Sequence, residues 1–510
     1  MPVPRPTNHA LLAAAEHHGF RLGPDDLASY AALIDATLGS YDVVNDLYPA
    51  TTSPAREHWA PSAEENVLGA WARRCDVLPE AGGVLEGRTV AVKDNIAVAG
   101  VPMVNGSASL EGFVPSVDAT VVTRVLGAGA RIAGKSVCED LCFSGSSFTA
   151  ISGPVRNPWA SSRSAGGSSS GSAALVVSGA ADLALGGDQG GSIRIPASFS
   201  GAVGHKPTYG LVPYTGAFPI ERTLDHLGPI ASSVADAALL LTVLAGPDGA
   251  DPSQSVRPPA VTDYSDLLDV PVDGLRIGLV REGFDHESSM NSVDDLVRSV
   301  ARAVPGAVVE EVSIPWHRQA FHLWNVIATD GGAYQMLDGN GYGLNSSGRY
   351  DPELMQFFAR QRIERADELS DTVKLVAMCG HYGVRTLGAA NYAKARNLVP
   401  VARAAYDEAL NKYDVLVMPT VPFTASLLAT PDDTRAEVID KALGMIANTA
   451  PFNVTGHPAV SVPAGFVDSL PVGLMIIGQH FNDDLVLRVA RQIEIVRGPH
   501  SFAAGATAAV

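Results

Sequence analysis

The chain has 510 residues, of which 46% are hydrophobic and 18% charged, so it is long enough to bury at least one large core and too apolar for general disorder. Its formal net charge of −18 would repel phosphate backbones and anionic lipids, which argues against nucleic acid and membranes as its main partners. Four cysteines are too few for a disulfide framework, and no apolar stretch reaches the ~20 residues of a membrane span, so we expect a cytoplasmic protein.

The first 80 residues are expected to form a separate helical segment. Within residues 8–47, apolar residues recur at helical spacing, at Leu27, Tyr30, Leu33, Ile34 and Leu38, and this period predicts helices. A helical attachment of this kind offers a surface to a second copy of the chain, so we expect a homodimer.

From residue 81 the sequence changes to short apolar strands that alternate with helices. The strand candidates are residues 88–92, 130–133, 275–280, 308–314, 414–418 and 472–477. This alternation predicts an α/β fold, with a mixed central β-sheet covered by helices on both faces. We assign residues 81–285 and 401–510 to this core, and residues 286–400, which are mainly helical in pattern, to an inserted cap domain.

Two motifs of known chemistry lack the structural context that the chemistry needs. Residues 129–136 match the phosphate-binding pattern G-x4-G-K-[ST], but that loop must follow a strand and begin a helix. Here a predicted helix precedes the first glycine, so nucleotide binding through Lys135 is only a distant alternative. The hydrolase spacing G-x-S-x-G occurs around Ser169 without an apolar strand before it, and we interpret it as a chance match.

The histidines and cysteines do not indicate a metal centre. None of the 13 histidines stands in a pattern such as H-E-x-x-H, which would place two imidazoles on one helix face. Cys138 and Cys142 lie four positions apart without a second pair at ligand spacing, so we interpret them as structural residues. We therefore expect neither a metal nor an organic cofactor.

Two segments rich in glycine and serine, residues 166–174 and 186–198, differ from ordinary linkers. Such runs are usually flexible loops, but each of these leads into or out of an apolar helix or strand pattern, which favours buried turns. Asp188 and Arg194 are placed to fix the second turn by their charges. Upstream, Lys93 ends an apolar strand, where a buried lysine is unusual.

These segments resemble those of a known family. The motif G-G-S-S-x-G-S-A lies 24 positions ahead of D-x-G-G-S-I-R-x-P, counted from Ser168 to Ser192, and together with Lys93 this spacing resembles the amidase signature family. Ser170 departs from the pattern, since many members have glycine there. The motifs most similar to the enantioselective bacterial amidases associated with nitrile hydratases are residues 188–191, 204–208 and 225–229.

The resemblance implies amide hydrolysis by a Ser-cisSer-Lys triad without a cofactor. Ser192 would be the nucleophile, and Ser168, which follows a cis peptide bond in the family, would pass its proton to Lys93. A lysine accepts a proton only when it is neutral, and burial disfavours the charged form of an amine. We therefore expect Lys93 to be enclosed, with hydroxyl groups rather than carboxylates around its amine.

The glycine-rich turn predicts an oxyanion hole, because consecutive backbone amides without side chains can approach a developing negative charge. The amides in question are those of Gln189, Gly190, Gly191 and Ser192. We expect Asp188 and Arg194 to support this loop rather than to contact substrate.

The candidates for the acyl pocket are Phe143, Trp324 and Ile446. An apolar, aromatic-lined pocket would suit small aliphatic or aromatic amides, hydrolysed to the acid and ammonia through an acyl-enzyme on Ser192. The alternatives are a related hydrolase of carbamates, anilides or ureas, and the glutamyl-tRNA amidotransferase subunit that has the same triad but passes its ammonia to a partner protein.

Overall fold

The computed structural model describes residues 2–49, 51–254 and 262–498. They divide into two compact units, Met1–Ser53 and Pro54–Val510. The boundary lies at residue 53 rather than at residue 80, because β1 (His58–Trp59) pairs with β2 (Trp71–Val77), and β2 pairs in turn with β4 (Arg131–Ser136) of the central sheet. None of the described helices is both long and apolar enough to cross a lipid bilayer.

The first unit contains two helices, α1 (Asn8–His17) and α2 (Pro24–Leu47). The Thr7 side chain accepts a hydrogen bond from the Ala10 amide and caps α1, and a proline at the first position suits the start of α2. Among the described residues of this unit, Ala15 is the one buried hydrophobic residue. This unit therefore does not bury a core of its own.

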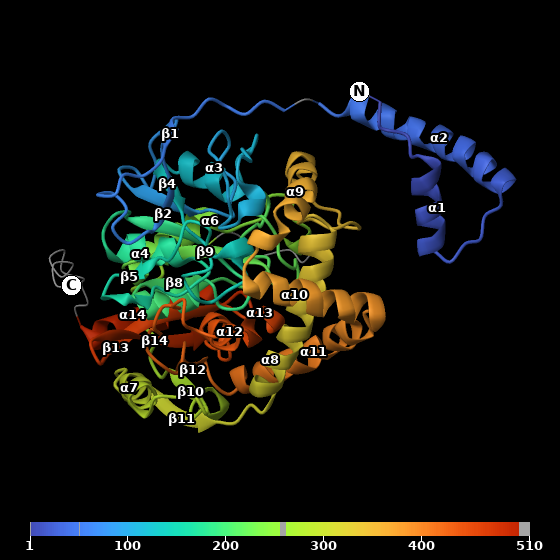
Figure 1. Ribbon diagram of the computed structural model, residues 1–510. Helices are drawn as coiled ribbons and strands as arrows, with labels where there is room; N and C mark the ends of the chain where they lie inside the picture. The colour runs from blue at the N-terminus through green and yellow to red at the C-terminus, as the bar shows by residue number, and fades with distance from the viewer. Residues whose placement is uncertain (1, 50, 255–261, 499–510) are drawn as a thin grey trace. The chain divides into compact units, whose positions relative to one another are not determined.

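The second unit is built on a large mixed sheet (Figure 1). The remaining strands are β3 (Thr89–Lys93), β5 (Arg156–Asn157), β6 (Ala160–Ser164), β7 (Leu183–Asp188), β8 (Val203–Lys206), β9 (His226–Ala231), β10 (Arg276–Val280), β11 (Val308–Val312), β12 (Val415–Pro419), β13 (Ala459–Val467) and β14 (Leu470–Ile477). In the described residues, twelve strands follow the order β1-β2-β4-β3-β7-β9-β8-β13-β14-β12-β10-β11, while β5 and β6 form a separate pair.

Helices cover both faces of this sheet, as predicted. The described helices of the second unit are α3 (Thr120–Gly127), α4 (Ser170–Val177), α5 (Arg194–Ser200), α6 (Val234–Leu244), α7 (Asn291–Arg302), α8 (Trp316–Val326), α9 (Pro352–Glu364), α10 (Asp371–His381), α11 (Ala390–Leu410), α12 (Arg435–Leu443), α13 (Pro451–Thr455) and α14 (Asp483–Arg497). Those that pack on the sheet include α4, α5, α6, α7 and α14. Successive strand residues face opposite layers. Accordingly, Val90 and Val92 pack in the core with α3 and α6, whereas Ala91 packs with α4.

The segment expected to form an inserted cap begins with elements of the sheet layers. Strand β11 extends the sheet beyond β10, and α7 packs on β12 and β13. From α8 onward the segment is helical, with π-helical turns at Ile327–Gly331 and Ala333–Asp338. Helix α8 carries Trp324 into a second apolar core that contains Phe143 and Ile446.

Candidate active site

The site is formed where two neighbouring parallel strands end. Strands β3 and β7 pair in parallel, so their carboxyl ends lie at the same edge of the sheet. Lys93 is the last residue of β3 and Asp188 the last of β7. The glycine-rich turn 189–193 follows directly and leads into α5.

Lys93 is completely buried, and its amine is surrounded by hydrogen-bonding oxygens. Its Nζ lies 2.8 Å from Ser168 Oγ and 3.0 Å from the Gly187 carbonyl oxygen. The neighbouring carboxylate of Asp94 is engaged elsewhere, since it forms an ion pair with Lys135 at 2.9 Å and accepts from the Asn105 amide. The amine is therefore enclosed by a hydroxyl and a carbonyl, as the sequence predicted.

Ser168 lies in the turn that precedes α4, and the Gly167–Ser168 peptide bond is cis. A Cβ atom on residue 167 would lie 1.8 Å from the Ser146 carbonyl oxygen, so only glycine fits at this position. The Ser169 amide donates to the Ser192 carbonyl at 3.2 Å. This contact holds the serine-rich segment against the glycine-rich turn.

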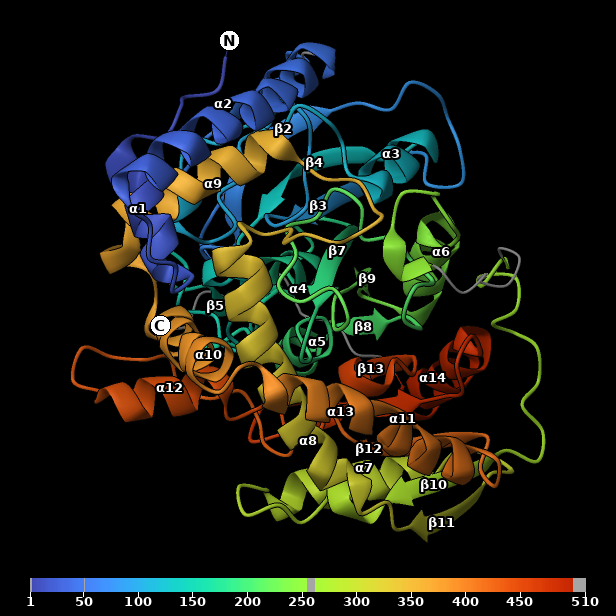
Figure 2. The ribbon, with the colours of Figure 1, turned by 90° about the vertical axis from the view of Figure 1, so that its right-hand side faces the viewer.

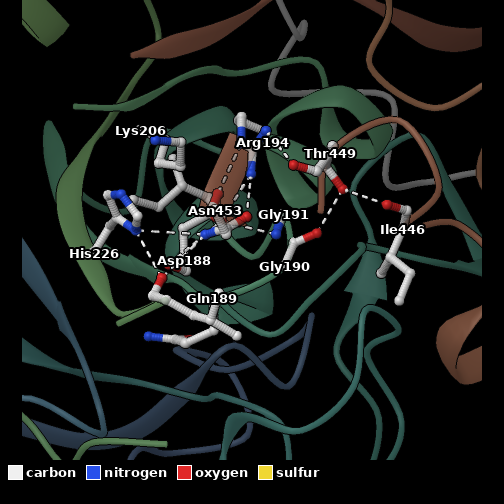
Figure 3. A network of polar contacts seen from close by, with 12 residues as sticks. Asp188, Gln189, Gly190, Gly191, Arg194, Lys206, His226, Ile446, Thr449 and Asn453 are labelled. Atoms are coloured by element: carbon white, nitrogen blue, oxygen red, sulfur yellow. Dashed lines mark hydrogen bonds and ion pairs between the residues drawn. The ribbon is translucent and has the colours of Figure 1, made fainter. Parts of the chain in front are cut away.

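Asp188 and Arg194 form a buried ion pair across the glycine-rich turn (Figure 3). Both nitrogens Nε and Nη2 of Arg194 lie 3.0 Å from the Asp188 carboxylate. The same carboxylate accepts hydrogen bonds from the Gly191 and Ile193 amides, at 2.8 and 3.1 Å. Burial alone would raise the pKa of Asp188, but the Arg194 guanidinium outweighs it and holds this pKa well below its usual range.

Side chains from distant segments hold the carbonyl groups of the turn (Figure 3). Trp324 Nε1 donates to the Gln189 carbonyl at 2.7 Å, and Thr449 Oγ1 donates to the Gly190 carbonyl at 2.6 Å. In α13, Asn453 Nδ2 donates to the backbone carbonyl of Asp188 at 3.0 Å. Sequence reasoning did not single out Thr449 or Asn453 for this role, and no local motif marks them.

Glycine is required at two positions of the turn, because the Trp324 and Thr449 side chains leave no room for a Cβ atom there. A Cβ atom at Gly190 would lie 2.7 Å from the Trp324 ring. At Gly191, with φ of +135°, it would lie 2.3 Å from Thr449 Oγ1, so a side chain there would be both strained and overcrowded. The Gly191 amide donates to Asp188, which removes it from the four amides expected to bind an oxyanion.

A pocket opens on Ser192. Phe143, Trp324 and Ile446, the three residues expected to line an acyl pocket, all border it. The other lining residues are Cys142, Ser144, Gly145, Gln189, Gly190, Ile220, Leu224, Ala328 and Leu443. No lining residue is Asp, Glu, Lys, Arg or His, so the pocket favours an uncharged, largely apolar group.

Cys142 lies closer to the chemistry than a purely structural cysteine would. It borders the pocket, and its thiol and that of Cys138 both donate to Asn105 Oδ1, at 3.2 and 3.4 Å. Burial raises the pKa of the Cys142 thiol, and the hydrogen bond with Cys138 lowers it. No pattern around Cys142 in the sequence signals its place beside the pocket, because the other lining residues come from distant segments.

Lys135 does not lie in a phosphate-binding loop. It belongs to strand β4, its side chain is completely buried, and it is paired with Asp94. The motif ends at Ser136, which is also the last residue of β4, and no α-helix begins there. A phosphate-binding loop must lie between a strand and a helix, whereas Lys135 lies inside a strand. The structure therefore argues against nucleotide binding through Lys135.

Comparison with known proteins decides the family. The model of the family described as Amidase matches residues 62–487. The chain belongs to the amidase family. It is 54% identical to an enantioselective amidase of Rhodococcus rhodochrous over 493 residues, which is 95% of each chain.

Other amidase relatives are more distant but still extensive. A glutamyl-tRNA(Gln) amidotransferase subunit of Haloarcula marismortui is 41% identical over 80% of this chain and 94% of its own. The crystal structure of a peptide amidase from Stenotrophomonas maltophilia is 31% identical, with a TM-score of 0.66 over 81% of this chain and 83% of its own. Relatives named for an amidotransferase and for a peptide amidase thus share this family.

Proposed function

We propose that the protein hydrolyses carboxylic acid amides to the acid and ammonia, through an acyl-enzyme on Ser192. The observation that carries this proposal is the buried contact between Lys93 Nζ and Ser168 Oγ at 2.8 Å, beside an apolar pocket that opens on Ser192. A serine hydroxyl is a weak nucleophile and needs a base. In the proposed route the proton of Ser192 reaches its base, Lys93, through the hydroxyl of Ser168.

In the first half-reaction, Ser192 Oγ attacks the amide carbonyl carbon while its proton moves to Ser168, whose own proton moves to the neutral Lys93 amine. The resulting tetrahedral intermediate collapses when Ser168 returns a proton to the amide nitrogen, the C–N bond breaks and ammonia leaves. In the second half-reaction, water attacks the ester of Ser192 by the same proton route. The acid is released and the serine hydroxyl is restored.

The proposed oxyanion donors are the amides of Gln189, Gly190 and Ser192. In a trans peptide the carbonyl and the following N–H point in opposite directions. Trp324 donates a hydrogen bond to the carbonyl of Gln189. The next amide, that of Gly190, therefore points in the direction opposite to that carbonyl. Removing one such donor in comparable hydrolases costs roughly 3–4 kcal/mol of barrier, so the turn matters about as much as the base.

The pocket supports small aliphatic and aromatic amides as substrates, with discrimination between enantiomers by a wall of branched and aromatic side chains. The relative from Rhodococcus rhodochrous is named as enantioselective, which supports the same property here. Carbamates, anilides and ureas are the nearest alternatives, since the same machinery would attack them. Glutamine is disfavoured, because its charged amino acid head would meet no ionic partner among the lining residues.

The test is a panel of aliphatic, aromatic and carbamate substrates together with glutamine, with ammonia or amine release measured for the full chain and for two variants. Ser192→Ala and Lys93→Ala should each abolish turnover of the best substrate. Hydroxylamine added to the wild type should divert the acyl group to a hydroxamic acid, which reports the acyl-enzyme directly. A Ser192→Ala protein that hydrolyses amides at a near-normal rate refutes the assignment.

We also propose that the protein is a homodimer in which α2 contacts the second copy. Helix α2 buries none of its residues, yet its exposed large apolar side chains are Tyr30, Leu33, Tyr41, Val43, Val44 and Leu47. An apolar surface of this extent favours a protein partner over water. Analytical ultracentrifugation should give a dimer for the wild type and a monomer for the double variant Leu33→Glu and Val44→Glu; an unchanged mass for the variant contradicts the proposal.

A further inference from the structure

Three side chains from separate segments meet away from the amide site. Asp407 lies on α11, His457 in the connection between α13 and β13, and His480 in the connection between β14 and α14. Their nearest ligand atoms all lie within 4.8 Å of one another. Figure 2 shows α11, α13, β13 and α14 gathered in one region of the second unit.

The backbone of Thr455 fixes the tautomer of His480. The ring nitrogen Nε2 of His480 lies 3.0 Å from the Thr455 carbonyl oxygen, and a carbonyl can only accept a hydrogen bond. Nε2 therefore carries the proton. In the neutral ring this leaves the lone pair on Nδ1, which lies 3.9 Å from Asp407 Oδ1.

His457 lies between Thr455 and Asp407. Its Nδ1 lies 2.9 Å from Thr455 Oγ1, and its Nε2 lies 3.0 Å from Asp407 Oδ1. The Nε2 atom of His457, the Nδ1 atom of His480 and the Asp407 carboxylate therefore converge on one place.

From this convergence we infer that Asp407, His457 and His480 form a binding site for a divalent cation of the zinc type. Two imidazoles and one carboxylate are a common ligand set for Zn²⁺, with bonds of about 2.0–2.2 Å, which place tetrahedral ligand atoms about 3.3 Å apart. The observed distances of 3.0 and 3.9 Å bracket that value. The Asp407 and His480 side chains are 46% and 25% exposed, so the cluster is accessible to an ion from solvent.

The other nitrogen of each ring lies within hydrogen-bond distance of a protein oxygen, at 2.9 Å for His457 and 3.0 Å for His480. Metal-binding histidines typically make such an outer contact, which fixes the ring orientation and makes the coordinating nitrogen a better ligand. Both of these oxygens belong to Thr455, the last residue of α13. Bound metal would therefore tie the end of α13 to α11, and α13 also carries Asn453, which holds the Asp188 turn.

The experiment uses the full chain without an affinity tag, stripped of metal with a chelator and then titrated with Zn²⁺ by calorimetry. Co²⁺ serves as a second probe, since its visible spectrum reports tetrahedral coordination. We expect one equivalent of tight binding and a higher unfolding temperature with Zn²⁺. The variants Asp407→Ala and His480→Gln should each weaken binding at least tenfold and lose the thermal shift, while circular dichroism shows that they fold.

The matched control is the double variant His17→Gln and His18→Gln, which removes two consecutive histidines at the end of α1. It should bind Zn²⁺ as the wild type does. Binding that is lost in this control but kept in the His480→Gln protein overturns the proposal, and so does a wild type that binds no Zn²⁺ at all. Activity is not the readout, because Zn²⁺ could also inhibit through Cys142 beside the pocket.

Discussion

The substitution Asp188→Asn tests how the glycine-rich turn is held. Asparagine keeps the shape of the side chain but removes its charge and replaces one acceptor oxygen by an NH₂ group. Every near neighbour of that carboxylate is a donor: the Gly191 and Ile193 amides, Arg194 and Asn453. One of these donors must therefore face another donor, and the Arg194 charge loses its partner.

The magnitude follows from burial, because both side chains of the pair are completely enclosed. Removing one partner of a buried ion pair costs about 3–5 kcal/mol, since an uncompensated charge stays behind. We expect the unfolding free energy to fall by that amount. If the turn shifts enough to misplace one oxyanion donor, kcat falls about 10²- to 10³-fold.

The assay is urea denaturation followed by circular dichroism, with ammonia release measured on the same preparations. Asp285→Asn is a matched control, because Asp285 pairs with Arg298 at 2.8 Å but its side chain is 69% exposed. Exposed pairs contribute only about 0–1 kcal/mol. The double variant Asp188→Asn with Arg194→Met removes the stranded charge, so it should be more stable than the single variant and still be inactive.

A loss of stability below about 1 kcal/mol for Asp188→Asn, equal to that of the exposed control, would refute the claim that this ion pair holds the turn. A variant that is destabilised as expected but hydrolyses amides normally would refute the second step, which links the turn to the oxyanion donors. Stability and turnover are measured independently, so either step can fail alone.

Three further predictions concern the residues around the turn and the pocket. Thr449→Val removes the hydroxyl that donates to the Gly190 carbonyl, which should cost about 1–3 kcal/mol of stability and lower kcat, whereas Thr449→Ser should keep both; equal kinetics for the two variants would contradict this. Ile446→Ala enlarges the pocket and should raise kcat/KM for a bulky aromatic amide relative to acetamide by about tenfold; an unchanged ratio would exclude Ile446 as a specificity wall. Burial lowers the pKa of Lys206 to about 7, whereas the unfolded lysine keeps its proton to about pH 10.4. Between these values the unfolded state binds more protons, so the stability of the wild type relative to Lys206→Met should rise with pH by up to about 1.4 kcal/mol per unit; urea denaturation from pH 6.5 to 9.5 checks the slope, and a flat difference refutes it.

The sequence predicted strands whose apolar runs contain at most one glycine. Residues 88–92, 130–133, 275–280, 414–418 and 472–477 overlap β3, β4, β10, β12 and β14. Strands β7, β9 and β13 were not predicted, because two breakers interrupt each of them. Strand β7 contains two glycines, β9 contains Gly228 and Pro229, and β13 contains Pro463 and a bulge before Gly465, and such residues usually mark loops.

The zinc-type cluster was missed for a different reason. Ligand motifs are recognised when the ligands share one helix or one loop, as in H-E-x-x-H. Here Asp407 and His457 lie 50 positions apart, and His480 comes from a third segment. Only the packing of α11 beside the ends of α13 and β14 brings them together, and no local pattern encodes that packing.

The glycine-rich turn shows how a local motif can record a distant contact. From the sequence, its glycines were interpreted as giving backbone amides access to substrate. The structure adds a second constraint, since a Cβ at Gly190 would collide with Trp324 and one at Gly191 with Thr449. These partners lie more than 100 positions away in the chain. The motif therefore marks where two far segments must close on the turn, but it does not say which residues they bring. That information resides in the distant segments, and this is why Asp188 and Arg194, which lie within the motif, could be named from the sequence as supports of the turn while Thr449 and Asn453 could not.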